Sequence, residues 1–106
     1  MPKYLLQVNY TLEGLKGLKY EGGSARVAAV KDATEAANGK LEAMYFAFGE
    51  HDVYVIVDYP DNMTAAGAAL AVSASGAARV RTVVLVTADE IDEAAKTAST
   101  YRPPGG

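Results

Sequence analysis

The sequence predicts an α+β fold whose elements follow one another as β-α-β-β-α-β, with one more helix at the C-terminal end. Four runs rich in β-branched and aromatic residues predict strands, and runs with helical periodicity lie between them. Two of the strand runs are separated only by the polar segment Gly49–Asp52, which is typical of a hairpin. This order is the ferredoxin-like, split βαβ arrangement, with a four-stranded antiparallel sheet and helices on one face.

The first strand is expected over Lys3–Tyr10, where the sequence reads KYLLQVNY. Thr11 is a typical N-cap residue and predicts a short helix that runs to about Lys19. The segment Tyr20–Gly23 carries paired glycines, which are poor helix formers, and is expected to interrupt the helix.

The next helix is expected over Ala25–Asn38, with Ser24 as its N-cap. Asn38 and Gly39 both tolerate a left-handed backbone and are expected to end it. Apolar and small residues recur near a spacing of 3.6 and predict the face that packs on the sheet, namely Val27, Val30, Ala33, Thr34 and Ala37.

The hairpin strands are expected over Leu41–Phe48 and Asp52–Tyr59. Asn62 then predicts the N-cap of a helix over Met63–Ser75, which Gly76 ends. The fourth strand is expected over Arg79–Val86, with the sequence RVRTVVLV.

The last helix is expected to begin after Thr87, because Thr87 and Glu90 have the spacing of a capping box, and to run to about Ala98. The proline-rich end, from about residue 100 to 106, is expected to be a tail of the single domain 1–106.

The composition narrows the classes of function. The net charge of -3 offers no general attraction to nucleic acid or to an anionic membrane. The chain has no cysteine, so disulfides and thiolate chemistry are excluded. No signal peptide or long apolar run is visible, and a cytoplasmic protein is therefore expected.

Both faces of the predicted sheet are apolar, and polar residues gather only at the strand ends. In the third strand Val53, Val55 and Val57 alternate with Tyr54 and Ile56. In the second strand strict alternation places Leu41, Ala43 and Tyr45 on one face and Met44 and Phe46 on the other. Because helices cover one face only, a second copy is expected to cover the other, in a homodimer or a higher homo-oligomer.

His51 and Asp52 are the candidate catalytic residues. His51 is the only histidine, and its charge can change near neutral pH. Asp52 could act as a general base or accept a hydrogen bond from a ligand. The alternative is that both residues only build the turn, with Asp52 accepting backbone N–H groups of the hairpin.

Candidate ligand-binding residues come from the strands and from one loop. Tyr10 and Tyr45, together with Asn9 and Tyr54, could line a cavity for an aromatic ligand, although tyrosines also serve in core and interface packing. The segment Glu21–Ser24 could form an anion site at the start of the following helix, with Arg26 nearby. The alternative is that it only breaks the helix and supplies an N-cap.

The helix over Thr64–Gly76 is unusually rich in small residues. Such residues either allow a close approach to the sheet or leave volume for a ligand between helix and sheet. One histidine with scattered carboxylates lacks the spacing of a metal site, and none is expected. A haem would need His51 or a tyrosine as axial ligand, and no cofactor is expected.

The chain resembles the GYD-domain family, within the dimeric α+β barrel superfamily. The resemblance rests on PKYLLQVNYT, on EGGSAR, on the segments 39–62 and 69–82, and on the closing YRPPG. The name of the family refers to a Gly-x-Tyr-Asp-like turn, and His51 occupies the aromatic position of that turn here.

The resemblance implies a dimeric α+β barrel. The turn followed by an apolar strand is also similar to the effector-binding domains of Lrp/AsnC regulators. No helix-turn-helix precedes the domain, so a DNA-binding regulator is not expected. We expect a homo-oligomeric domain that binds or senses a small molecule. The alternatives are a cofactor-free enzyme of the small monooxygenase or isomerase type, with a pocket between sheet and helices, and a purely structural assembly protein.

Overall fold

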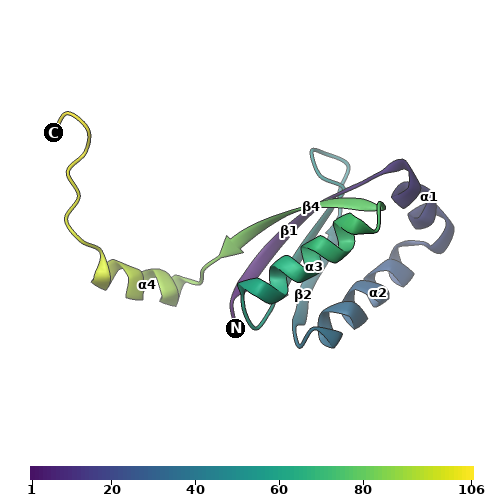
Figure 1. Cartoon of the computed structure of the whole chain (residues 1–106), viewed down its shortest axis with the longest axis horizontal. Helices are drawn as coiled ribbons and strands as arrows, with labels where there is room; N and C mark the ends of the chain where they lie inside the picture. Colours follow the sequence, from purple (N-terminus) through teal and green to yellow (C-terminus); the bar gives the residue numbers. More distant parts are fainter.

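The computed structural model describes residues 1–106 and has four strands and four helices (Figure 1). They follow one another as β1 Lys3–Tyr10, α1 Leu12–Glu21, α2 Gly23–Ala36, β2 Lys40–Phe46, β3 Val53–Asp58, α3 Asn62–Ala74, β4 Ala78–Leu85 and α4 Ala88–Thr97. None of the helices has the length and apolar character needed to cross a membrane.

The four strands form one antiparallel sheet in the order β2-β3-β1-β4. Helices α2 and α3 lie side by side on one face (Figure 1), with α2 packed against the edge strand β2 and α3 against the edge strand β4. The arrangement confirms the predicted α+β, ferredoxin-like fold. The central strands β1 and β3 therefore lie beneath the space between the two helices.

The core lies between the sheet and these helices, and alternate residues of β3 define it. Val53, Val55 and Val57 are 1%, 3% and 0% exposed, whereas Tyr54 and Ile56 on the opposite face are only half-buried. Three more buried residues complete the cluster: Tyr4, Tyr59 and Ala65.

Strict alternation fails in β2, where the prediction for Leu41 and Met44 is wrong. The register shifts between Leu41, which pairs with Val57, and Ala43, which pairs with Ile56. The extra residue is Glu42, and a β-bulge of this kind reverses the direction of the side chains that follow it. Leu41 and Met44 consequently both pack against the core.

The break between the first two helices is shorter than predicted. Only Gly22 leaves the helical conformation, with φ of 85°, and it serves as C-cap of α1 and N-cap of α2. Ser24 is inside α2 and does not cap it, because a single glycine in this conformation is enough to turn the chain. Asn38 takes a left-handed backbone, as expected, two residues after α2 ends.

The N-cap of α3 is Asp61 and not Asn62. The Asp61 carboxylate accepts hydrogen bonds from the Thr64 N–H at 2.8 Å and from the Thr64 hydroxyl at 2.7 Å. These bonds hold the pKa of Asp61 below its usual value. Asn62 does not cap the helix. Its Oδ1 instead accepts a hydrogen bond from the buried Tyr4 hydroxyl at 2.5 Å.

The hairpin between β2 and β3 is longer than the predicted tetrad, because the strands end at Phe46 and begin again at Val53. The Ala47 N–H still donates to the Asp52 carbonyl at 2.8 Å, so the chains stay paired at the base of the loop. Phe48 at the tip is fully exposed.

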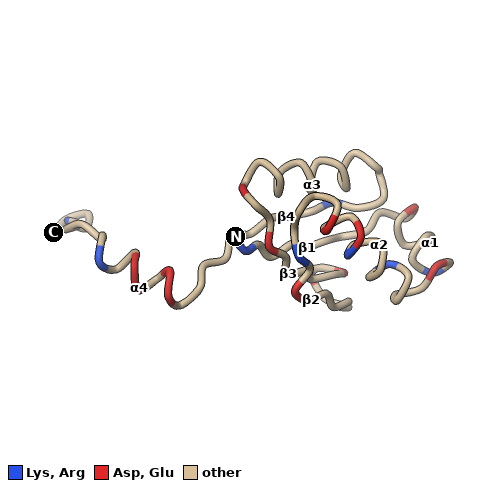
Figure 2. Tube along the Cα trace, turned by 90° about the horizontal axis from the view of Figure 1, so that it is seen from below, with Lys and Arg blue, Asp and Glu red and all other residues tan.

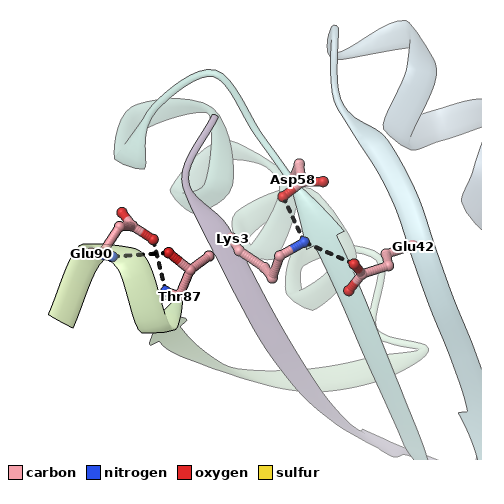
Figure 3. A network of polar contacts seen from close by, with 5 residues as sticks. All are labelled: Lys3, Glu42, Asp58, Thr87 and Glu90. Atoms are coloured by element: carbon pink, nitrogen blue, oxygen red, sulfur yellow. Dashed lines mark hydrogen bonds and ion pairs between the residues drawn. The ribbon is translucent and has the colours of Figure 1, made fainter. Parts of the chain in front are cut away.

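The C-terminal helix α4 stands apart from the rest of the molecule (Figure 1). Thr87 and Glu90 form the predicted capping box (Figure 3). Every residue of α4 is exposed, and its acidic residues outnumber its single lysine; Figure 2 marks the acidic positions in red along the trace. A ten-residue helix is marginal in water on its own, and α4 gains little stability from packing against its own chain.

The opposite face of the sheet carries an ion-pair network at one end (Figure 3). Lys3 Nζ lies 3.0 Å from Asp58 Oδ1 and 3.1 Å from Glu42 Oε1, which joins β1, β3 and β2. The hydrogen bond to Asp58 is the main cause of the raised pKa of Lys3. Next to this network Leu5 and Ile56 present apolar side chains with no helix over them, and polar residues return at the other end of the face.

Candidate ligand-binding site

A cavity of about 680 Å³ lies between the sheet and helices α2 and α3. Its floor comes from the central strands, with Leu6 and Val8 from β1 and Val53 and Val55 from β3. Its walls are the facing sides of the two helices, including Val30 of α2 and the α3 residues Ala68, Ala71 and Val72. In total, 17 of its 22 lining residues are hydrophobic, so the cavity favours an apolar occupant.

The cavity exists because the two helices sit over the edge strands and the side chains between them are short. Helix α3 has the sequence NMTAAGAALAVSA and carries no charged residue (Figure 2). It approaches the sheet closely at Ala65, which is 3% exposed. Away from that contact its alanines are too short to reach α2. Helix α3 therefore both approaches the sheet closely and leaves volume between helix and sheet, the two consequences expected of its small residues.

Two polar side chains with hydrogen-bond donors line the cavity beside the α1–α2 junction, Tyr10 and Arg26. Burial raises the pKa of the Tyr10 phenol, while the nearby Arg26 charge acts in the opposite direction. The phenol is therefore neutral at physiological pH and keeps its O–H as a donor. Arg26 is the only charged residue in the lining.

His51 lies in a second, smaller and polar pocket of about 380 Å³. The ring is buried, with Nδ1 2.7 Å from Asn9 Oδ1 and its edge against the Tyr54 ring. The Asn9 amide in turn donates to the Glu50 carbonyl at 2.9 Å. Each partner is a neutral group of the turn or of an adjacent strand, and the pocket is completed by four more side chains: Gln7, Arg79, Val80 and Arg81.

Asp52 uses its carboxylate within the sheet. Its Oδ2 accepts the Tyr10 N–H at 2.9 Å, and its own N–H donates to the Val8 carbonyl at 2.9 Å. The side chain thus satisfies a backbone donor at the end of β1, beyond the last ladder pair of β1 with β3. The Asp52 carboxylate therefore accepts its hydrogen bond from strand β1. The sequence had suggested that the donors would be backbone N–H groups of the hairpin itself.

The structure brings the predicted residues together in two groups and not in one. Tyr10 and Arg26 line the large cavity, whereas His51, Asn9 and Tyr54 gather on the other side of the sheet. A single cavity shared by Tyr10, Asn9 and Tyr45 does not form within the chain. Neighbouring strand residues point to opposite faces, and Tyr45 is 73% exposed.

Sequence reasoning missed most of the apolar lining. Floor residues such as Leu6 and Val53 read as ordinary core positions, because a strand pattern does not show where the covering helices will part. The signal that was available is the run of small residues in α3. No group of three or more His, Asp and Glu side chains lies close enough to hold a metal ion.

The family model of the GYD domain matches residues 4–95, from the first strand into α4. The chain belongs to the GYD domain family. No curated protein and no solved structure matches it. In this GYD domain the turn position expected to be aromatic is filled by His51, which still packs edge-on against an aromatic ring, that of Tyr54.

Proposed function

We propose that this GYD domain binds a small, largely apolar molecule in the cavity between the sheet and helices α2 and α3. The observation that carries the proposal is the cavity itself, with about 680 Å³ of space and a lining in which 17 of 22 residues are hydrophobic. Ligand sites commonly occupy about 300 to 1,000 Å³ and combine apolar walls with a few polar groups.

We also propose that the domain acts as a homodimer or a higher homo-oligomer. Two surfaces support this. The half-buried Leu5 and Ile56 form an apolar row on the sheet face that no helix covers, and α4 extends away from its own chain. A second copy related by a two-fold axis would cover the same surface on both copies.

An enzyme is the less well supported alternative. Catalysis needs polar groups that converge on the bound substrate. His51 and Asp52, the candidate catalytic pair, do not line the large cavity, and the Asp52 carboxylate is engaged by the Tyr10 N–H. If turnover is found, we expect His51→Ala and Asp52→Asn to reduce it while the fold is retained.

Binding is tested with N-phenyl-naphthylamine, a neutral aromatic probe whose fluorescence rises in apolar surroundings. Ala68→Phe places a large ring in the cavity wall and should abolish the fluorescence gain. Ala66→Phe is the matched control, because Ala66 is exposed on the same helix and does not line the cavity. Probe binding that survives Ala68→Phe in a folded protein would contradict the proposed site.

The oligomer is tested by native mass spectrometry and by sedimentation across a range of dilutions. The expected result is a dimer or a larger assembly that Ile56→Lys dissociates, because a lysine there places a charge on the uncovered sheet face. A wild-type monomer at high protein concentration would contradict the oligomer without bearing on the cavity.

A further inference from the structure

We propose that the molecule bound in this cavity is an anion, an apolar body that carries one carboxylate or comparable acidic group, and that the acidic group binds at Arg26. The inference rests on the proposed function of the cavity and adds the chemical class of its ligand. It follows from the polar groups of the lining, which are few and lie in identifiable places.

Arg26 is the only charged residue among the 22 that line the cavity. The Glu21 carboxylate, outside the lining, lies 3.0 Å from Arg26 Nε, so an acidic group of a ligand would compete with Glu21 for the guanidinium group. A cationic ligand would bring a like charge into a space of low polarity, where repulsion is weakly screened. A singly charged anion would gain a charge-assisted hydrogen bond from the guanidinium group and leave its apolar part for the surrounding side chains.

Arg26 has a donor that its own chain does not satisfy. Its Nε lies 3.0 Å from Glu21 Oε1, so the two side chains attract each other as charges. The N–H nevertheless does not point at that oxygen, and the buried Nε has no hydrogen-bond partner. Buried donors are almost always paired, and an acceptor supplied by a ligand would satisfy this one.

Tyr10 supplies a second donor in the same cavity. Among the charges that act on the pKa of its phenol, that of Arg26 has the largest effect, ahead of those of Glu21 and Asp52. No hydrogen bond within the chain occupies its hydroxyl. A carboxylate has two oxygens that accept hydrogen bonds, so one acidic group can accept from Arg26 and Tyr10 together.

Three of the other hydroxyl groups in the lining are committed elsewhere, and the phenol of Tyr59, which also lines the cavity, lies beside Thr34. The Thr34 hydroxyl donates to the Val30 carbonyl at 2.7 Å, and the Thr64 hydroxyl donates to Asp61 at 2.7 Å. The Ser75 hydroxyl donates to the Val72 carbonyl at 2.6 Å. The only charged donor of the lining, Arg26, lies with Tyr10 where β1 and the start of α2 meet the cavity, and this end is where the acidic group would lie.

The test compares two probes that share an aromatic skeleton and differ in charge, anilinonaphthalene sulfonate and neutral N-phenyl-naphthylamine. Both are titrated into the wild-type chain and into Arg26→Gln, Arg26→Lys and Tyr10→Phe. Arg79→Gln is the matched control, because Arg79 is exposed and does not line the cavity. Thermal unfolding of each variant verifies that it is folded.

We expect the anionic probe to bind the wild type more tightly than the neutral probe. Arg26→Gln should lower the affinity for the anionic probe by about tenfold or more, as expected for the loss of a charge-assisted hydrogen bond. The affinity for the neutral probe should be nearly unchanged. Arg26→Lys should retain more of the anionic affinity than Arg26→Gln, because it keeps the charge. Tyr10→Phe should give a smaller loss that is also selective for the anion.

The two proposals fail in different ways. If the neutral probe binds, Ala68→Phe displaces it, and the anionic probe gains nothing from Arg26, the cavity stands and the anionic ligand is overturned. If Arg26→Gln weakens the binding of both probes equally, and Arg26→Lys binds them no better, Arg26 has a purely structural role. That result would also overturn the anionic ligand. If neither probe enters the cavity, the proposed function itself fails.

Discussion

Helices α1 and α3 both use small residues, with opposite consequences for the space around them. At Gly14 of α1 an added Cβ would lie 2.0 Å from the Ala77 carbonyl oxygen and 2.9 Å from the Tyr10 ring. At Gly67 of α3 an added Cβ would meet nothing within 4 Å. Small side chains bring α1 into contact with its neighbours, whereas in α3 they leave room.

The difference shows that the cavity is not a sign of loose packing throughout the domain. The end of the molecule near α1 is tightly joined, because Thr11 N–H and hydroxyl both donate to the loop between α3 and β4. The middle of the same side is open because α2 and α3 are separated over the central strands. Four predictions test this contrast.

The largest expected effect is at Gly14. Gly14→Ala should lower the free energy of unfolding by about 3 kcal/mol, since the new methyl group would press on a backbone carbonyl that cannot move freely. Gly17→Ala in the same helix meets no atom within 4 Å and should instead stabilise by about 1 kcal/mol through helix propensity. Urea unfolding of both variants measures the difference. Equal stabilities would mean that α1 does not pack as described.

The next effect compares the two faces of β3. Val57→Ala should cost about 2 kcal/mol, because Val57 is fully buried beneath the helices. Ile56→Ala should act mainly on the association of copies, since Ile56 lies on the uncovered face. Chemical unfolding and dilution experiments separate the two losses. An Ile56→Ala chain that associates like the wild type would remove this face from the interface.

A smaller gain is expected at Gly67. Gly67→Ala should raise the free energy of unfolding by about 1 kcal/mol, because it removes the helix cost of glycine and no neighbour obstructs the methyl group. Probe binding should be retained, since one methyl group is small beside the cavity. Thermal unfolding together with a probe titration checks both statements, and a destabilised variant would show that α3 is closer to its neighbours than described.

The smallest effect concerns pH. Hydrogen bonds from Thr64 lower the pKa of Asp61 below the ordinary 3.8, so the charged cap stabilises the fold above that value. This contribution is lost as the pH falls through the lowered pKa. Asp61→Asn keeps a capping oxygen without the charge. The wild type should melt at the higher temperature near neutral pH, and the gap should close as the pH falls through the lowered pKa of Asp61. A gap independent of pH would contradict the role of the charge.

Rules that depend only on neighbouring residues predicted several elements of this chain correctly. The strand over Lys3–Tyr10 and the capping box at Thr87 were predicted correctly, because both depend on neighbouring residues alone. The cap of α3 was misplaced by one residue, since Asp61 and Asn62 are equally good caps by type. Only the tertiary contact of Asn62 with Tyr4 shows which of them is free to cap.

The sequence by itself determined the order of the elements and the absence of cysteine chemistry. It also placed Tyr10 and Arg26 among the candidate ligand-binding residues. Only the tertiary structure decided that those two share a cavity while Asn9 and His51 lie in another pocket, and that Glu42 reverses the alternation of β2. The physical reason is that periodicity sets the direction of a side chain within its own strand. The space that the side chain meets depends on where two distant helices settle over the sheet.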